Sequence, residues 1–235
     1  MDKNKLTPPK KDLGNKTHDY LKDLIKIYTG GILNPLIDYI LPSLHHKRYE
    51  EWCQNISDTL IELDNQKISS ENLQDNLEFI SILKESMIIA SKNHQSEKLN
   101  MLKTGILNSL NKEISFDSKL IFIRLIDNLS LSHIIVLKII SENLNHFQNL
   151  NKFEDIYQTL LSFNNSLSFS ESEFIFILNE LDRNSLMKIS REIEYNEDVR
   201  EYPRALVSDG NSNLPFMILK EFGKQFLEFI LSEYE

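Results

Sequence analysis

The sequence contains little cysteine, glycine or proline, and it has no long run of apolar residues. Its single cysteine, Cys53, excludes an internal disulfide framework and is typical of a reducing compartment. Six glycines and six prolines in 235 residues leave room for long uninterrupted helices. A membrane-spanning helix needs roughly 20 consecutive apolar residues, but the most apolar early stretch, 30–44, is interrupted by Pro35, Asp38 and Pro42. We therefore expect a soluble, cytoplasmic protein.

Positively charged residues are also fewer than negatively charged ones. The chain has 26 Lys and Arg against 35 Asp and Glu, which gives a formal net charge of -9 and a sequence pI of about 5.2. Proteins gain non-specific affinity for nucleic acids when Lys and Arg displace counterions from the phosphates. Nucleic acid is therefore disfavoured as a partner. The first residues are polar and no apolar stretch follows them directly, so we expect no secretory signal.

Apolar residues recur at helical spacing through the first half of the chain. They predict helices over residues 17–28, 44–63, 70–92, 94–110 and 119–129. In the third of these, apolar residues cover most of the circumference, which places that helix centrally, and the fifth is apolar nearly all round. Residues 17–129 are therefore predicted to form a helical bundle, preceded by a mobile tail at 1–16.

The remainder of the chain follows a different pattern. Three helices are predicted first, and Ser170 and Glu173 form a capping box at the start of the third. Two short strands then flank the turn signal at Asp209-Gly210-Asn211, and an amphipathic helix follows. The predicted bounds are 131–144, 153–161 and 171–186 for the helices, 186–189 and 214–219 for the strands, and 221–234 for the last helix.

This order is that of a winged-helix-like module, which we predict for residues 130–235. The predicted fold class is mainly α: a helical bundle followed by a small winged-helix-like module with one β-hairpin.

A thiol nucleophile is the first candidate for catalysis. Cys53 would need a base nearby, and the closest histidines in sequence are His45 and His46. On a helix, residues 46 and 53 are separated by about 10 Å of axial rise, too far for a direct hydrogen bond. Cys53 also adjoins Trp52 in a core-forming pattern, so packing as a small apolar residue is the favoured interpretation.

Two polar pairs are candidate sites. His94 and Glu97 have the spacing of a metal pair, but a zinc or di-iron centre needs at least three or four converging donors, and no HExxH motif occurs. Asp127 and His133 bracket a helix junction where Ser130 or Ser132 is a natural N-cap. Helix capping is the favoured interpretation of both pairs.

Sequence signatures of nucleotide and acyl-transfer chemistry are missing. Gly30-Gly31 lacks both a preceding strand and the GK[ST] ending of a phosphate-binding loop, and no GxSxG elbow occurs. We therefore predict a protein that is not an enzyme and that has no cofactor or metal.

The winged-helix-like module raises the question of DNA binding. In a DNA-reading winged helix the third helix enters the major groove and is usually basic. Here that helix carries Arg183 alone against Glu171, Glu173, Glu180 and Asp182. The wing region mixes Lys188, Arg191, Arg200 and Arg204 with Glu192, Glu194, Glu197, Asp198 and Glu201. Contact with another protein is therefore favoured over DNA.

An apolar segment near the N-terminus is flanked by basic residues. This combination is typical of segments that bind an anionic membrane surface. The alternative, which we favour, is an apolar hairpin packed against the bundle, because Asp19, Asp23 and Asp38 dilute the positive charge. The candidate membrane or partner surface comprises Lys22, Lys26, Ile32, Leu33, Leu36, Ile40, Lys47 and Arg48.

The order of features resembles an uncharacterised family of bacterial helical proteins with a C-terminal winged-helix-like module. The resemblance covers roughly residues 30–230 and lies in the overall pattern, not in one diagnostic motif. It implies a bacterial, cytosolic setting, and no site residues carry over from it. The matching segments are His45-His46-Lys47-Arg48-Tyr49-Glu50-Glu51-Trp52, Asn76-Leu77-Glu78-Phe79-Ile80, Ala90 to Leu99, Phe122 to His133 and Phe222 to Ile230.

Three functions follow from these observations, in order of preference. The first is a non-enzymatic bacterial protein-interaction or regulatory protein whose partner is another protein. The second is an effector that acts at a membrane surface through the segment 17–48. The third is a DNA-binding regulator that uses the C-terminal module. The sequence leaves the pathway, the partner and the oligomeric state open.

Overall fold

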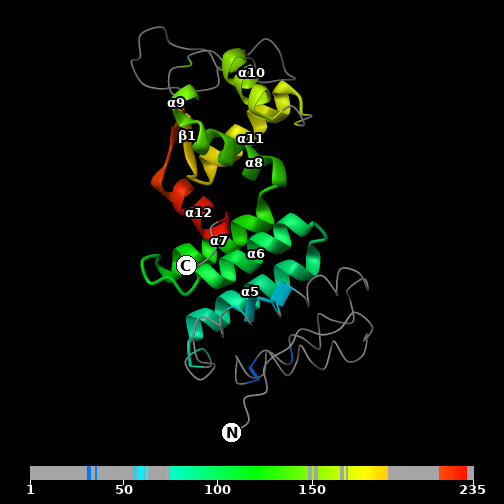
Figure 1. Cartoon of the computed structure of the whole chain (residues 1–235), viewed down its shortest axis with the longest axis vertical. Coiled ribbons are helices and arrows are strands. Elements are labelled where there is room, and N and C mark those ends of the chain that lie inside the picture. The colour runs from blue at the N-terminus through cyan, green and yellow to red at the C-terminus, as the bar shows by residue number, and fades with distance from the viewer. Residues whose placement is uncertain are drawn as a thin grey trace, which may run out of the picture. The chain divides into compact units, whose positions relative to one another are not determined.

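The computed structural model describes residues 31–32, 35, 55–56, 58–60, 62, 73, 75–147, 150, 153–164, 167, 169–189 and 217–231. Figure 1 shows the chain, with these residues drawn in colour. Within this part the protein is mostly helical, which confirms the predicted mainly-α class. The predicted tail at 1–16 and the turn at Asp209-Gly210-Asn211 lie outside the described residues.

The chain divides into two compact units. The first consists of Met1–Asn128 together with Phe229–Glu235, and the second of Leu129–Glu228. Helix α12 (Glu221–Leu231) therefore begins in the second unit, and its last three residues belong to the first. The sequence pattern placed all of 130–235 in one module.

Three helices form the described core of the first unit: α5 (Leu77–Lys92), α6 (Ser96–Asn108) and α7 (Phe116–Asn128). Each packs against the other two, as Figure 1 shows. Their inward faces consist of large apolar side chains that are almost completely buried, which is the main stabilising contribution in such a bundle. The most buried are Phe79, Ile82, Leu83, Met87, Ile106, Phe122, Ile123 and Ile126. Ile121, on the outer side of α7, is 45% exposed.

Helix α5 begins later than predicted. The periodicity predicted one helix over 70–92, but Asp75 lies in a turn and Asn76 is the N-cap of α5. The side-chain oxygen of Asn76 accepts a hydrogen bond from the backbone amide of Phe79 at 3.0 Å. Asparagine offers the backbone this alternative partner, so it starts a helix more readily than it continues one. The start of α5 is therefore set by the polar side chain of Asn76, which the pattern of apolar residues does not reveal.

The hydroxyl of Ser86 is buried inside α5. Ser86 is 1% exposed, and within the described part of the chain its Oγ has no hydrogen-bond partner. A buried polar group without a partner carries a desolvation cost that is not repaid. The surrounding helices contribute mainly apolar side chains, so this position is suited to alanine.

We predict that Ser86→Ala raises the free energy of unfolding by about 1 kcal/mol, because it removes the unsatisfied hydroxyl. Chemical denaturation followed by circular dichroism measures the change. Ser81→Ala, in the same helix, is the control: the Ser81 hydroxyl donates to the carbonyl of Leu77 at 2.8 Å in an exposed setting. A Ser86→Ala variant less stable than the Ser81→Ala variant would contradict this account.

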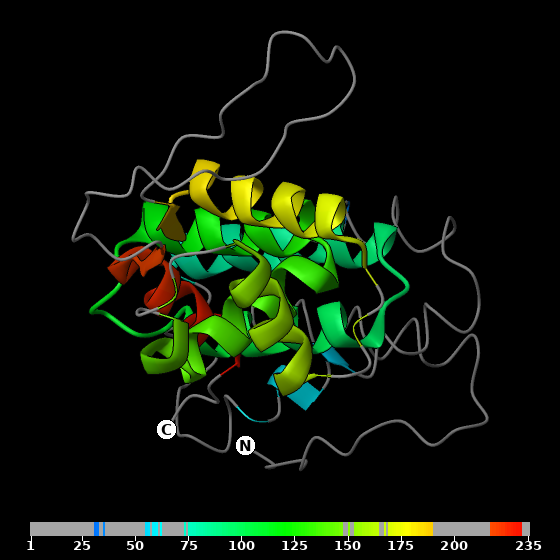
Figure 2. The same cartoon turned by 90° about the horizontal axis from the view of Figure 1, so that it is seen from above.

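Among the described residues of the second unit, four helices precede two strands. They are α8 (Leu131–Glu142), α9 (Leu144–Phe147), α10 (Phe153–Phe163) and α11 (Glu171–Arg183). Helix α8 is central, because α9, α10 and α11 all contact it. Figure 2 shows α11 as an outer helix lying along α8. The buried side chains include Val136, Leu137, Ile140, Phe147, Ile156, Leu160, Phe174, Leu178 and Leu181.

Two short strands follow α11 in this unit. Strand β1 (Met187–Ile189) pairs antiparallel with β2 (Met217–Leu219), with Met187 opposite Leu219. Both strands lie within the predicted segments 186–189 and 214–219. The residues that connect them, 190–216, lie outside the described residues.

Helix α12 starts against the backbone of Leu186, just before β1. The carbonyl of Leu186 accepts a hydrogen bond from the amide of Lys220 at 3.2 Å. Gly223, in the first turn of α12, lies directly over this carbonyl. A Cβ atom at position 223 would lie 2.0 Å from the Leu186 oxygen. The close approach of helix and loop therefore requires glycine.

Candidate functional site

The predicted membrane or partner surface lies mostly outside the described residues. Of its eight residues the structure describes Ile32, which is 58% exposed. Ile32 follows Gly31 in a turn, where Gly31 has a positive φ of 83°. Lys22, Lys26, Leu33, Leu36, Ile40, Lys47 and Arg48 are not described, and neither are His45, His46 and Cys53.

The predicted metal pair, His94 and Glu97, lies where α6 begins. His94 is exposed in the loop before α6, and Glu97 is exposed in its first turn. The Glu97 carboxylate accepts a hydrogen bond from the Ser96 hydroxyl at 3.2 Å. Within the described part of the chain, no group of three or more His, Cys, Asp or Glu could hold a metal ion.

Asp127 links α5, α6 and α7, the helices that form the described core of the first unit. Its carboxylate accepts a hydrogen bond from the side-chain amide of Asn93, the C-cap of α5, at 3.2 Å. The Lys92 ammonium lies 3.8 Å from the same carboxylate. The backbone carbonyl of Asp127, in the last turn of α7, accepts a hydrogen bond from the Lys98 ammonium at 3.1 Å. Each polar group of Asp127 thus has a structural partner.

Lysines are buried at two positions of the first unit. Lys98 and Lys119 are 5% and 4% exposed. Burial lowers the pKa of Lys98, and the negative charge of Asp127 opposes that shift. Burial likewise lowers the pKa of Lys119, with Glu78 acting in the opposite direction. A cation near the C-terminal carbonyls of a helix is a favourable arrangement, and Lys98 occupies that position at the end of α7.

His133 and Ser130 form a contact at the start of α8. Ser130 occupies the predicted N-cap position, but its hydroxyl makes no side-chain bond to the helix backbone. Instead, Ser130 Oγ lies 2.6 Å from His133 Nδ1, at hydrogen-bond distance. The His133 ring is 7% exposed and meets the ring of Phe176 on α11 edge-on, with centroids 6.0 Å apart. The ring contact between His133 and Phe176 therefore ties α8 to α11.

The start of α11 is fixed by the predicted capping box. The amide of Glu173 donates to the Ser170 hydroxyl at 3.3 Å, and the amide of Ser170 donates to the Glu173 carboxylate at 2.7 Å. The Ser170 hydroxyl also donates to this carboxylate, at 2.9 Å. The backbone amide of Ser170, followed by its hydroxyl, holds the pKa of Glu173 below the ordinary value. The prediction of a capping box is confirmed.

The capping box makes stability depend on pH in a defined direction. Folding lowers the pKa of Glu173. The contribution of its carboxylate to the free energy of unfolding is therefore present above the unfolded pKa near 4.5 and is lost as the pH falls through the folded pKa. We predict that Glu173→Gln lowers the thermal midpoint at pH 7 and that its difference from wild type narrows below pH 4.5. Glu171→Gln, in the same turn, is the control. A difference that stays constant down to acidic pH would exclude this linkage.

Helix α11 has an aromatic residue on its outer side. Phe174, Ile177, Leu178 and Leu181 form its buried face, whereas Phe176 is 59% exposed. Sequence reasoning did not single out Phe176. The signal was present, because two residues apart on a helix are separated by about 200° around its axis, so Phe174 and Phe176 cannot both face the core.

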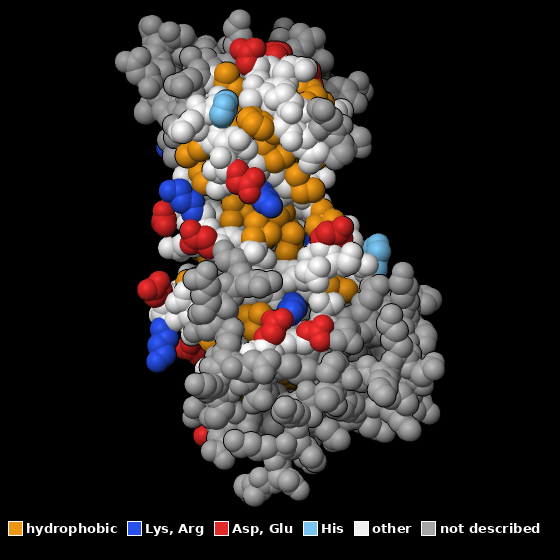
Figure 3. All heavy atoms as spheres, in the orientation of Figure 1, with side chains coloured by type: hydrophobic (Ala, Val, Ile, Leu, Met, Phe, Trp, Pro, Cys, Tyr) orange, Lys and Arg blue, Asp and Glu red, His pale blue; other side chains and the backbone are white. Residues whose placement is uncertain are grey.

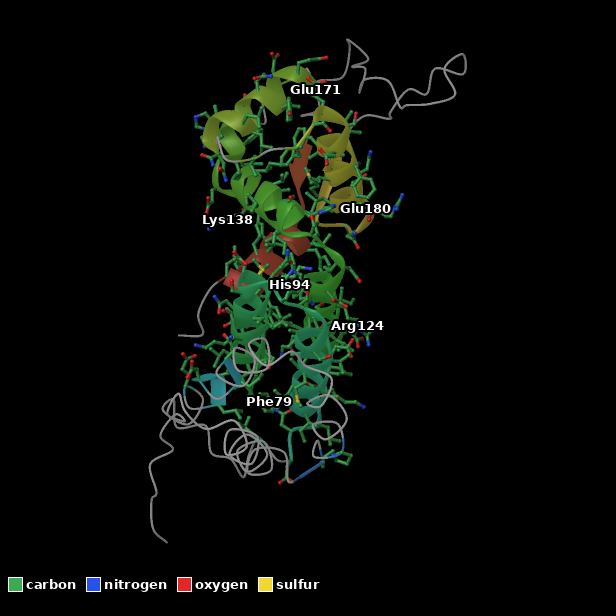
Figure 4. All side chains as sticks on the ribbon, turned by 90° about the vertical axis from the view of Figure 1, so that its right-hand side faces the viewer. Phe79, His94, Arg124, Lys138, Glu171 and Glu180 are labelled. Carbon is green, nitrogen blue, oxygen red and sulfur yellow. The ribbon has the colours of Figure 1, made fainter. Side chains whose placement is uncertain are left out.

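The charged groups of α11 are mainly acidic. Figure 4 shows two of them, Glu171 and Glu180, near opposite ends of the helix. The single basic residue, Arg183, lies 2.6 Å from the Glu180 carboxylate. The outer side of α11 thus combines an exposed phenylalanine with carboxylates, and its cation already has an intramolecular partner.

Comparisons with protein-family models, with curated proteins and with solved structures found no match. The resemblance to a family of bacterial helical proteins therefore stays a prediction.

Among the described residues no single helix is long and apolar enough to cross a membrane. One bent pair, Phe116–Asn128 with Leu131–Glu142, passes the length and composition criteria only when both helices are taken together.

Proposed function

We propose that this chain is a non-enzymatic protein-interaction or regulatory protein that binds its partner through α11. The observation that supports this proposal is Phe176, a large aromatic side chain that is 59% exposed in the middle of a well-anchored helix. The edge-on contact with His133 limits the freedom of the Phe176 ring. An aromatic side chain held in place before binding loses little entropy in an interface, and aromatic residues dominate many interfaces.

We further propose that the second unit is winged-helix-like. The order of α8, α10, α11, the paired strands β1 and β2, and α12 supports this assignment. In such a module α11 would hold the position of the DNA-reading helix. Its carboxylates would repel phosphates, so we assign this helix to a protein partner. A salt-dependent electrophoretic mobility shift with duplex DNA would contradict that choice.

The test of the proposed function is the recovery of a partner from the native host. The tagged full-length protein is expected to co-purify with a stoichiometric partner, and Phe176→Ser is expected to reduce recovery at least about ten-fold. Ile121→Ser is the matched control, since Ile121 is 45% exposed on α7 and its loss should leave recovery unchanged. Failure to recover any stoichiometric partner, or equal recovery with Phe176→Ser, would count against the proposal.

Membrane-surface binding through residues 17–48 is the second candidate function. One described residue favours it: Ile32, a β-branched apolar side chain, is 58% exposed in a turn. An exposed apolar side chain near lysines can insert at the boundary of an anionic bilayer. Flotation with vesicles that contain anionic lipid tests the idea. Binding at low salt that is lost in Ile32→Ser would support it, and no binding at low salt would end it.

A further inference from the structure

The first turn of helix α12 is attached to the backbone of Leu186 in the second unit. The Leu186 carbonyl accepts a hydrogen bond from the amide of Lys220 at 3.2 Å, and Gly223 lies against the same carbonyl. The Leu186 amide in turn donates to the carbonyl of Leu181, in the last turn of α11, at 3.0 Å. Backbone hydrogen bonds at Leu186 therefore connect the end of α11 to the start of α12.

The last turn of α12 is attached to the first unit. The Phe229 ring is buried, and its centroid lies 5.4 Å from that of Phe122 on α7. The Phe229 carbonyl accepts a hydrogen bond from the side-chain amide of Asn108 on α6 at 3.0 Å. A Cβ atom added to Gly105, also on α6, would lie 3.0 Å from Phe229 Cε1. The Phe229 ring and carbonyl are therefore held by both α6 and α7.

These two attachments lie close together on one short helix. Phe229 follows Gly223 by six positions, which is less than two helical turns. Helix α12 has 11 residues, and isolated helices of fewer than about 12 to 15 residues are marginally stable in water. Figure 3 shows basic and acidic side chains on the outside of α12, so its stability comes from packing of its apolar side. Release of either end therefore removes support that the other end needs.

We propose that α12 couples local opening of the two units. Release of its last turn from α6 and α7 loosens its first turn and β1 in the second unit, and release of the first turn loosens the core of the first unit. The element with two states is the last turn of α12, which is either helical and docked through Phe229 or frayed. Each unit stabilises the helical state, so the coupling is reciprocal. This device goes beyond the proposed function, and no partner is needed to test it.

A pair of substitutions at Lys224 tests the coupling and leaves both attachments unchanged. Lys224 is exposed between the two attachments, and its ammonium lies 3.7 Å from the Glu221 carboxylate. Lys224→Gly and Lys224→Ala both remove this ion pair, but only glycine weakens the helix. Hydrogen exchange of the full-length protein is read by mass spectrometry under native conditions. In the glycine variant, β1 in the second unit and α6 and α7 in the first should exchange about five-fold faster than in the alanine variant. Faster exchange confined to α12 would overturn the coupling.

A substitution in the first unit gives a second measurement. Phe229→Leu keeps an apolar side chain, and it should speed exchange about five-fold or more at β1 as well as in α6 and α7. Leu83→Ala is the matched control, because Leu83 is fully buried on α5, whereas the contacts of Phe229 described above are with α6 and α7. It should speed exchange in the first unit alone. Faster exchange at β1 in both variants would indicate general destabilisation, and faster exchange at β1 in neither would show that the units open independently. Either result would overturn the proposal.

Discussion

Gly223→Ala is expected to lower the free energy of unfolding by about 3 kcal/mol, the largest loss among single-methyl additions in the described part of the chain. The added Cβ would lie 2.0 Å from the carbonyl oxygen of Leu186 and 2.9 Å from its carbonyl carbon. These are backbone atoms, so relief requires α12 to move away from the loop before β1. That movement would break the hydrogen bond from the Lys220 amide to the same carbonyl.

A destabilising effect of Gly223→Ala would distinguish this glycine from an ordinary glycine within a helix. In an exposed helix interior, Gly→Ala ordinarily stabilises by about 1 kcal/mol. Gly105→Ala provides the comparison, because its Cβ would approach the ends of two side chains, Ile123 Cδ1 at 2.9 Å and Phe229 Cε1 at 3.0 Å. Side chains can shift where a backbone carbonyl cannot, so Gly105→Ala should cost less than Gly223→Ala.

Urea denaturation measures both glycine variants, and hydrogen exchange read by mass spectrometry locates the change. In Gly223→Ala, amides near β1 and at the start of α12 should exchange faster. A Gly223→Ala variant as stable as wild type would show that α12 does not rest on Leu186.

Phe229→Ala is expected to destabilise the first unit by about 3 to 5 kcal/mol. The Phe229 side chain is 1% exposed, and its ring lies 5.4 Å from that of Phe122 on α7. Its backbone carbonyl accepts a buried hydrogen bond from the Asn108 side chain at 3.0 Å. Truncation to alanine removes a large ring from a core where neighbours on α6 and α7 cannot close the space, so a cavity remains.

Leu231→Ala is the matched control for Phe229→Ala. Leu231 lies two residues further along α12 and is 39% exposed, so its truncation should cost less than about 1 kcal/mol. In Phe229→Ala, peptides from α5, α6 and α7 should lose protection from hydrogen exchange. Equal stability of the two alanine variants would contradict the placement of Phe229 in this core.

The sequence predicted most of the features that depend on local chemistry. Helical periodicity located α6, α7, α8, α10 and α11 to within a few residues, and the Ser170 and Glu173 pair located the start of α11. The break at Asn76 was missed because the apolar pattern continues through it. At Ser130 the cap position was predicted, but the hydroxyl meets His133 instead of a backbone amide. A side chain that offers two competing partners cannot be assigned from periodicity alone.

Packing contacts between residues far apart in the chain could not be predicted from the sequence. Phe229 belongs to the apolar face of an amphipathic helix, and nothing in the local sequence links it to Asn108 or Gly105, more than a hundred residues earlier. Gly223 appeared as an isolated glycine in a helix, which signals a packing constraint without naming its partner. The exposure of Phe176 could have been predicted from its spacing to Phe174, so the candidate site was partly accessible to sequence reasoning.

The division of α12 between the units affects how the chain folds during synthesis. Translation delivers α5, α6 and α7 first, and domains generally fold in that order as they emerge. Phe229, however, is made only after the whole second unit, Leu129–Glu228. At ordinary synthesis rates the three helices would wait roughly 5 to 20 s for the ring that completes their core. During that interval the gap beside Gly105 and Phe122 would present apolar surface to chaperones.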